Sequence, residues 1–167
     1  TILPFAMQIK GQSLRKCVED YHKKASGKLY IDTSFHLIIS DPTPQVLGQE
    51  LPALSKDGYT SFKVFMTYDD LVLNDKELIE VFDVAKQLKT LVMVHAEGYD
   101  SIKYLSDKFE KEGKTAPYYH APTRPQIVER EATHRAISHA QIVDIPLMIV
   151  HVSGDEALNQ IRWAKDK

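Results

Sequence analysis

Residues 60–68, Thr-Ser-Phe-Lys-Val-Phe-Met-Thr-Tyr, form a short apolar stretch with turn-forming residues on both sides. Asp-Gly precedes the stretch at 57–58, and Asp-Asp follows it at 69–70. Its length and its aromatic and β-branched content predict a buried strand rather than a helix. Lys63 stands in the middle, where burial of an unpaired ammonium group costs free energy.

Lys63 can be interpreted in more than one way. Its side chain could run along the strand edge and reach water with its ammonium group. Alternatively, an apolar pocket lowers the pKa of the lysine, and the neutral amine becomes a nucleophile. Such an amine could form a Schiff base, or it could take up carbon dioxide and become a carbamate, which binds metals as a carboxylate does. The rest of the chain has to decide among these interpretations.

Strand-like and helix-like segments alternate on both sides of this stretch. The predicted strands are 2–7, 29–39, 60–68, 91–95 and 147–152, and the predicted helices are 12–25, 44–56, 75–88, 102–111, 126–143 and 156–164. We expect Ser13 to cap the first helix, and Pro52 makes the second one imperfect. This alternation predicts parallel strands joined in right-handed β-α-β units.

Two α/β architectures contain such units, an open doubly wound sheet and a (β/α)8 barrel. No Gly-x-Gly-x-x-Gly and no Walker motif follows any predicted strand, which argues against the first. Barrel enzymes build their sites at the carboxyl ends of the strands. Five polar side chains are expected within or just beyond strands, which favours the barrel: His36, Lys63, Tyr68, His95 and His151.

The composition is that of an ordinary globular domain. The 167 residues are 43% hydrophobic and 26% charged, and the net charge of −2 gives no reason to expect a nucleic-acid or membrane partner. The single cysteine, Cys17, excludes a disulfide framework within the chain and suits a reducing compartment, so we expect a cytoplasmic location. We expect neither a membrane span nor a signal peptide.

Two histidines end apolar strands in the same way. His95 follows Val-Met-Val, and His151 follows Met-Ile-Val. Each could be a structural histidine, but the two lie on separate strands of one predicted parallel sheet, and the buried Lys63 lies on a third. Imidazole is a common ligand for borderline metals, and a carbamate on Lys63 could supply oxygens to two metals at once. A metal pair activates a bridging water and polarises a carbonyl group.

Four segments closely resemble dihydropyrimidinase, also called D-hydantoinase, in the cyclic-amidase branch of the amidohydrolase superfamily. They are Ser-Phe-Lys-Val-Phe-Met-Thr-Tyr at 61–68, Val-His-Ala-Glu at 94–97, Tyr-His-Ala-Pro-Thr-Arg-Pro at 119–125 and Val-His-Val-Ser at 150–153. The segments at 2–6 and 13–15 also look like the bacterial form. The resemblance runs from one end of the chain to the other.

The resemblance implies a metal-dependent hydrolase with a (β/α)8 TIM barrel. In such an enzyme Lys63 would be the carbamylated lysine that bridges two zinc ions, His95 and His151 would bind one of them, and Tyr68 would contact the substrate ring. Residues 65–75 would form a loop that shapes the pocket around the exocyclic group of the substrate. The implied reaction opens 5,6-dihydropyrimidines or 5-substituted hydantoins to N-carbamoyl amino acids, as in pyrimidine degradation, in a homotetramer.

The chain departs from the family pattern in three places. The His-x-His pair of the first barrel strand would lie before Thr1, the late metal-binding aspartate would lie beyond Lys167, and Gly98 replaces the usual asparagine after His-Ala-Glu. Residues 1–167 are therefore expected to be a central part of the catalytic barrel, about five of its eight βα units, without the flanking β-sandwich and the closing strands. We expect these residues alone to be inactive.

Several alternatives remain open at this point. Relatives of the family act as non-catalytic adaptors in oligomeric assemblies, and they lack the metal ligands. Allantoinase and dihydroorotase are related cyclic amidases. The presence of Lys63, His95 and His151 favours an enzyme over an adaptor, and Tyr68 with its Phe-Lys-Val-Phe-Met context favours the dihydropyrimidinase branch.

Overall fold

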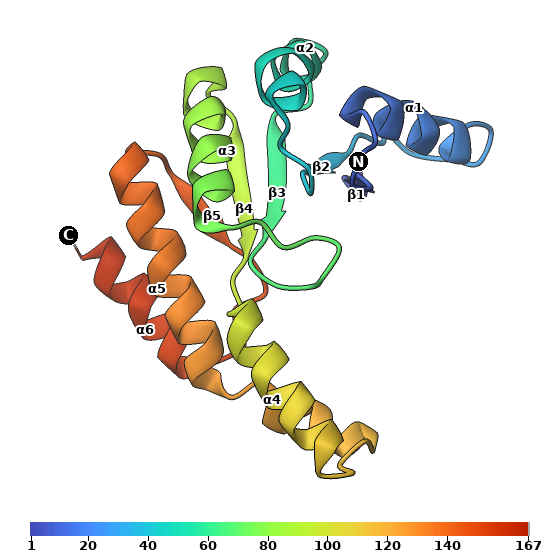
Figure 1. Ribbon diagram of the computed structural model, residues 1–167. Coiled ribbons are helices and arrows are strands. Elements are labelled where there is room, and N and C mark those ends of the chain that lie inside the picture. The colour runs from blue at the N-terminus through green and yellow to red at the C-terminus, as the bar shows by residue number, and fades with distance from the viewer. Residues whose placement is uncertain (167) are drawn as a thin grey trace.

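A five-stranded parallel sheet forms the centre of the molecule in the computed structural model, which describes residues 1–166 (Figure 1). The strands are β1 (Phe5–Met7), β2 (His36–Ile38), β3 (Ser61–Phe65), β4 (Leu91–His95) and β5 (Leu147–Ile149). Each strand pairs in parallel with the next strand along the chain. This sequential order is that of a (β/α)8 barrel, whereas a doubly wound sheet reverses direction at a switch point.

Helices follow every strand. They are α1 (Leu14–Ala25), the π-helical η1 (Val46–Glu50) continuing into α2 (Leu51–Lys56), α3 (Asp75–Leu88), α4 (Tyr99–Lys111), the 3-10 helix η2 (Pro117–Thr123), α5 (Gln126–Val143) and α6 (Asp155–Lys165). Figure 1 shows α4 and the segment after it extending away from the sheet. The predicted α/β fold with five βα units is therefore confirmed. No helix within residues 1–166 is long and apolar enough to cross a membrane.

One face of the sheet carries the hydrophobic core. Side chains alternate along a strand, so residues paired across neighbouring strands share a face. The helix-covered face is fully buried at Ala6, Leu37, Phe62, Val64, Val92 and Val94, and apolar side chains of α1, α2, α3 and α5 pack in the same cluster. Each large side chain buried in this way contributes about 1.5–3 kcal/mol of stability.

The opposite face carries the Lys63 and His95 side chains. The pairing register places Lys63 beside Met93, and Phe65 beside His95. Parts of this face are open: Phe5 is 41% exposed and Met148 is 45% exposed. In a closed (β/α)8 barrel this face would be the interior.

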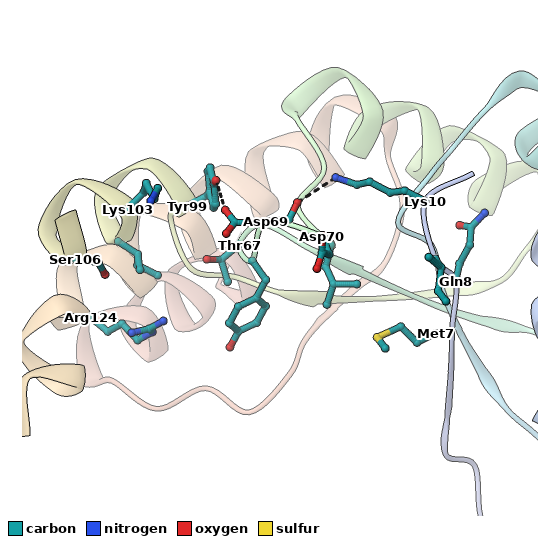
Figure 2. A pocket seen from close by; sticks show the side chains of 14 residues that line it. Met7, Gln8, Lys10, Thr67, Asp69, Asp70, Tyr99, Lys103, Ser106 and Arg124 are labelled. Atoms are coloured by element: carbon teal, nitrogen blue, oxygen red, sulfur yellow. Dashed lines mark hydrogen bonds between the residues drawn. The ribbon is translucent and has the colours of Figure 1, made fainter. Parts of the chain in front are cut away.

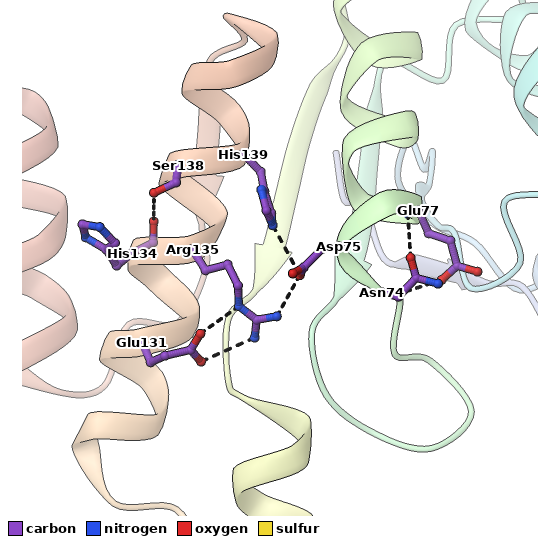
Figure 3. Close-up of polar contacts among 8 residues, drawn as sticks. All are labelled: Asn74, Asp75, Glu77, Glu131, His134, Arg135, Ser138 and His139. Atoms are coloured by element: carbon purple, nitrogen blue, oxygen red, sulfur yellow. Dashed lines mark hydrogen bonds and ion pairs between the residues drawn. The ribbon is translucent and has the colours of Figure 1, made fainter.

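An ionic network joins α5 to α3 (Figure 3). The Arg135 guanidinium lies 2.8 Å from Asp75 of α3 and 2.8 Å from Glu131 of its own helix. His139 Nε2 lies 3.3 Å from the same Asp75 carboxylate. These contacts, together with the buried alanines of α5, hold the helix against its neighbour.

Helix starts follow the capping rules. The predicted cap Ser13 accepts a hydrogen bond from the Lys16 N–H, at 3.3 Å. The buried Glu50 carboxylate adds a distant cap, since it accepts bonds from the Leu14 N–H at 2.6 Å and the Arg15 N–H at 3.3 Å. A complete capping box formed by Asn74 and Glu77 opens α3.

The outer strands are shorter than predicted. The predicted strand 29–39 contains only His36–Ile38, so His36 is the first residue of the strand. Residues 29–31 lie exposed on the surface, where no neighbouring strand pairs with them, and Thr33 joins Ile2 through an isolated bridge. Pro52 lies at the start of α2, directly after the π-helical η1, and the helix continues past it.

Candidate metal centre

Lys63 lies in the centre of β3, on the open face of the sheet. Its side chain is 4% exposed, and its Nζ lies 4.8 Å from the centre of the Phe65 ring and 5.4 Å from that of Phe5. Within residues 1–166, no carboxylate or hydrogen-bond acceptor pairs with this ammonium group. Burial lowers the pKa of Lys63 from 10.5 to about 8, so a fraction of the amine is neutral near physiological pH.

His95 ends β4 and is held by its neighbours. Its ring stacks on Phe65 at 5.3 Å between ring centres, and the edge of Tyr68 approaches at 5.2 Å. Its Nε2 lies 2.6 Å from a Glu97 carboxylate oxygen. The hydrogen bond from His95 lowers the pKa of Glu97, while burial acts in the opposite direction. When Nε2 donates to Glu97, Nδ1 is the nitrogen left with a free lone pair.

His151 lies two residues beyond β5, at a left-handed backbone position with φ 39°. Its ring centre is 4.5 Å from that of His95. Burial lowers the pKa of His151, and the nearby His95 and Lys63 lower it further. A lower pKa favours the neutral imidazole, which is the form that binds metal.

Tyr68 lies in the turn after β3, also at a left-handed position, with φ 72°. Its carbonyl accepts hydrogen bonds from the Leu71 N–H at 3.0 Å and the Val72 N–H at 2.8 Å, which closes the turn. The adjacent Asp69 fixes the turn from outside, as its carboxylate accepts a hydrogen bond from the Tyr99 hydroxyl and its carbonyl accepts one from Lys10 Nζ at 3.1 Å. Figure 2 shows both contacts.

A cavity of about 790 Å³ opens beside this turn (Figure 2). It lies between the residues after β1, the turn after β3, and α4; its lining includes Met7, Lys10, Tyr68, Asp69, Tyr99, Lys103 and Arg124. The two histidines line a smaller, more polar cavity of about 200 Å³, which they share with Glu97, Arg124 and Glu129. Tyr68 therefore belongs to the wall of a large pocket, and its ring lies against the histidine that borders the small one.

The side chains present fit part of a metal site. The two imidazole rings lie edge to face, and a lysine with a lowered pKa lies in an apolar setting on the strand next to His95. Within residues 1–166, no group of three or more His, Cys, Asp or Glu side chains is placed to hold a metal. A carbamate on Lys63 would add an oxygen ligand to the histidine pair.

The structure brings together the four site residues predicted from the sequence, Lys63, Tyr68, His95 and His151. It also shows contacts of Glu97 and Glu129 that the sequence reasoning missed. Glu97 follows His95 by two residues, and this spacing was a usable signal. Glu129 gave none, because a glutamate near the start of a helix is ordinarily solvated. His36 lies near this group, with its Nδ1 2.5 Å from Ser61 Oγ.

Comparisons with known proteins show which enzymes the chain is similar to. The chain is 46% identical to D-hydantoinases of Ralstonia pickettii and Rhizobium radiobacter over 100% and 99% of its length, and 37% identical to dihydropyrimidinase of Rattus norvegicus over 98%. It spans 36%, 36% and 32% of these relatives. No protein-family model matches the chain.

Solved structures show the same fold. A D-hydantoinase structure superposes on 98% of the chain with a TM-score of 0.94 at 45% identity, and a dihydropyrimidinase from Brevibacillus agri with 0.93 at 40% identity. The chain covers 36% of each of these proteins. The resemblance and the barrel-type fold predicted from the sequence are thus confirmed.

Proposed function

We propose that this chain, which matches a segment of D-hydantoinases and dihydropyrimidinases along its whole length, is a central part of the catalytic barrel of a cyclic amidohydrolase. The reaction of the whole protein would be hydrolytic opening of a 5,6-dihydropyrimidine or a 5-substituted hydantoin to an N-carbamoyl amino acid. One observation carries the proposal: the rings of His95 and His151 lie edge to face, with their centres 4.5 Å apart, beside the desolvated Lys63.

Lys63, His95 and His151 would hold the metal. When bound, zinc supplies a Lewis acid and lowers the pKa of a coordinated water. The neutral amine of Lys63 adds to carbon dioxide, a new N–C bond forms and one N–H proton leaves, so that the product is an anionic carbamate. The pKa of about 8 makes the amine available for this addition. The second zinc of a bridged pair would need further ligands from the whole protein.

Tyr68 would act on the substrate directly. It lines the large cavity, and its ring contacts His95, so its hydroxyl is available to donate a hydrogen bond to a carbonyl oxygen that gains charge. Residues 67–71 line the same cavity, and the loop 65–75 to which they belong would surround the exocyclic group of the substrate. A small cyclic amide or ureide is the partner that this cavity suits.

A homotetrameric assembly and a cytoplasmic location belong to the same proposal. The tetramer is supported by the resemblance alone. The location is supported by the resemblance and by the single cysteine, Cys17, which is buried in the core and unpaired.

Replacing Lys63 tests the function. In the whole enzyme, Lys63→Ala should remove metal from the bridged position and abolish turnover of dihydrouracil, whereas the exposed Lys56→Ala should change neither. Metal analysis and a hydrolysis assay measure the two effects. Survival of both metal content and turnover in Lys63→Ala would show that the carbamate assignment is wrong.

Two further assays distinguish the carbamate from a Schiff base on Lys63, and this enzyme from related cyclic amidases and adaptor-type homologues. Borohydride trapping with substrate would reveal a Schiff base on Lys63, and the proposal predicts no trapped adduct. A panel of dihydrouracil, hydantoin, allantoin and dihydroorotate would distinguish the cyclic amidases. We expect turnover of the first two substrates only, and no turnover of any substrate would instead favour the adaptor-type homologue.

A further inference from the structure

Glu129, in the first turn of α5, binds the turn that carries His151. One carboxylate oxygen accepts a hydrogen bond from the Ser153 N–H at 2.8 Å, and the other accepts one from the Gly154 N–H at 2.7 Å. Charge-assisted bonds of this kind are about twice as strong as neutral ones. The carboxylate is therefore tied to two consecutive backbone groups directly after the histidine.

The turn is held at its other end by the sheet. The Val150 N–H donates to the Val94 carbonyl at 3.2 Å, so the residue before His151 is still tied to β4. Within the turn, Ser153 Oγ donates to the His151 carbonyl at 3.0 Å. His151 itself adopts the left-handed φ of 39°, which a residue with a side chain rarely adopts unless its surroundings impose it. The two anchors supply that constraint.

Gly154 allows α5 to approach this closely. A Cβ at this position would lie 3.0 Å from the Glu129 carboxylate and 3.3 Å from the Gln126 side chain. Gly154 is also the N-cap of α6 and has no side chain with which to cap it. The Glu129 carboxylate accepts the N–H of this N-cap residue from a different helix, at the end where negative charge is favoured.

The turn after His95 meets α5 in a similar way. Gly98, the N-cap of α4, donates its N–H to the Val128 carbonyl at 3.2 Å, and a Cβ there would lie 3.0 Å from Glu131. Each glycine follows its histidine by three residues. Both histidine turns therefore contact residues 128–131 of α5. Further along the same helix, Arg135 and His139 contact Asp75 of α3.

We propose that Glu129 is a positioning residue that sets the place of His151 against His95, with the first turns of α5 as the shared support for both histidines. The role in metal binding rests on the proposed function, whereas the spacing of the two rings does not. The rival explanation is that Glu129 only stabilises α6.

The test compares Glu129→Ala and Glu129→Gln with Glu156→Ala as the matched control. Glu156 is an acidic residue in the first turn of α6 that pairs with Arg130 of α5 at 3.1 Å, and its variant weakens the same helix contact without touching the turn of His151. The metal-free protein with isotope-labelled histidines is used. The measurements are nuclear Overhauser effects between the two imidazole rings, and Tm.

We expect Glu129→Ala to lose the nuclear Overhauser effects between the two rings. Glu129→Gln keeps one acceptor oxygen and should weaken them. Glu156→Ala should retain them even if its Tm falls. The proposal would be overturned if both Glu129 variants retained the ring-to-ring effects, or if the Glu156→Ala control lost them to the same extent. If Glu129→Ala fails to fold, Glu129→Gln decides on the same criterion.

Zinc titration of the same proteins separates this inference from the proposed function. We expect Kd to rise about 10-fold or more in Glu129→Ala and to stay unchanged in Glu156→Ala. A wild-type protein that binds no zinc at the histidine pair would contradict the proposed function, while the ring-to-ring effects would still decide the role of Glu129. An unchanged Kd in a Glu129→Ala protein that has lost those effects would contradict the positioning role.

Discussion

At the scale of residues, the buried Lys63 lowers the free energy of unfolding, because burial disfavours its charged form. Its folded pKa of about 8 lies below the ordinary 10.5, so at pH values below 8 the folded state carries the full cost of the buried ammonium. As pH rises from 8 to 10.5 the folded state loses its proton first, and stability increases. The difference between the two pKa values corresponds to at most about 3 kcal/mol of unfolding free energy.

Lys63→Met should therefore stabilise the metal-free protein at pH 7. We expect the gain in unfolding free energy to be of order 1–3 kcal/mol and to shrink as pH rises toward 10.5, because the wild-type cost disappears there. Denaturant unfolding at several pH values measures it, with Lys56→Met as the exposed control. A variant less stable than wild type at pH 7 would show that the ammonium has a stabilising partner.

Tyr68→Phe removes the proposed hydrogen-bond donor and keeps the ring that contacts His95. In the whole enzyme, kcat should fall about 100-fold or more while KM changes little, since a bond of this kind strengthens in the transition state. Steady-state kinetics on dihydrouracil measure both constants, and Tyr104→Phe on exposed α4 serves as the control. A rise in KM at constant kcat would instead give Tyr68 a role in ground-state binding.

Sequence reasoning identified Lys63, His95 and His151 because a charged or polar group inside an apolar strand is conspicuous. It could not identify Glu129, whose role depends on the approach of α5 to a turn 24 residues further along the chain. Only the folded geometry shows that its carboxylate faces two backbone N–H groups.

At the scale of elements, the turn after β3 depends on contacts made by Asp69. Tyr99→Phe removes the hydroxyl that donates to the Asp69 carboxylate and leaves the aromatic ring in place. We expect faster amide hydrogen exchange at Leu71 and Val72, because the turn opens more often. Mass spectrometry of exchanged peptides measures this. Unchanged exchange in Tyr99→Phe, relative to Tyr118→Phe as the control, would show that Lys10 alone holds the turn.

Helix α1 depends on a cap that comes from the end of η1. Glu50→Ala should lower the free energy of unfolding by about 1–3 kcal/mol, since the Leu14 N–H and its neighbour lose their acceptor inside the protein. Thermal or denaturant unfolding measures the loss, and the exposed Glu19→Ala in the same helix should have little effect. Equal effects of the two substitutions would mean that water satisfies the freed N–H groups.

The positions of the α-helices could be predicted from apolar periodicity, and the Ser13 cap from its residue type. The lengths of the outer strands could not, because residues 29–31 have strand-forming side chains but no neighbouring strand to pair with. The π-helical start before α2 was also beyond prediction.

At the scale of the whole molecule, the order of strands followed from the β-α alternation and from the polar residues at strand ends. Among residues 1–166, β1 pairs only with β2, β5 pairs only with β4, and one face of the sheet exposes Phe5 and Met148. Unpaired edges and an open apolar face favour association with further chain.

We expect the 19.0-kDa chain by itself to hydrolyse no cyclic amide at a measurable rate. Two imidazoles and one carbamate leave one position of a metal pair with a single protein ligand, which is too few to hold and use both metals. An assay with dihydrouracil and added zinc, on material whose mass is verified as 19.0 kDa, measures this. Robust turnover would contradict the expectation.

The most direct test of the metal centre is a crystal structure of the whole zinc-loaded protein with anomalous diffraction measured at the zinc edge. We predict an anomalous peak within coordination distance of both His95 and His151, together with electron density for a carboxyl group on Lys63 Nζ. Zinc bound elsewhere, with an unmodified Lys63 and no peak at the two histidines, would contradict the account.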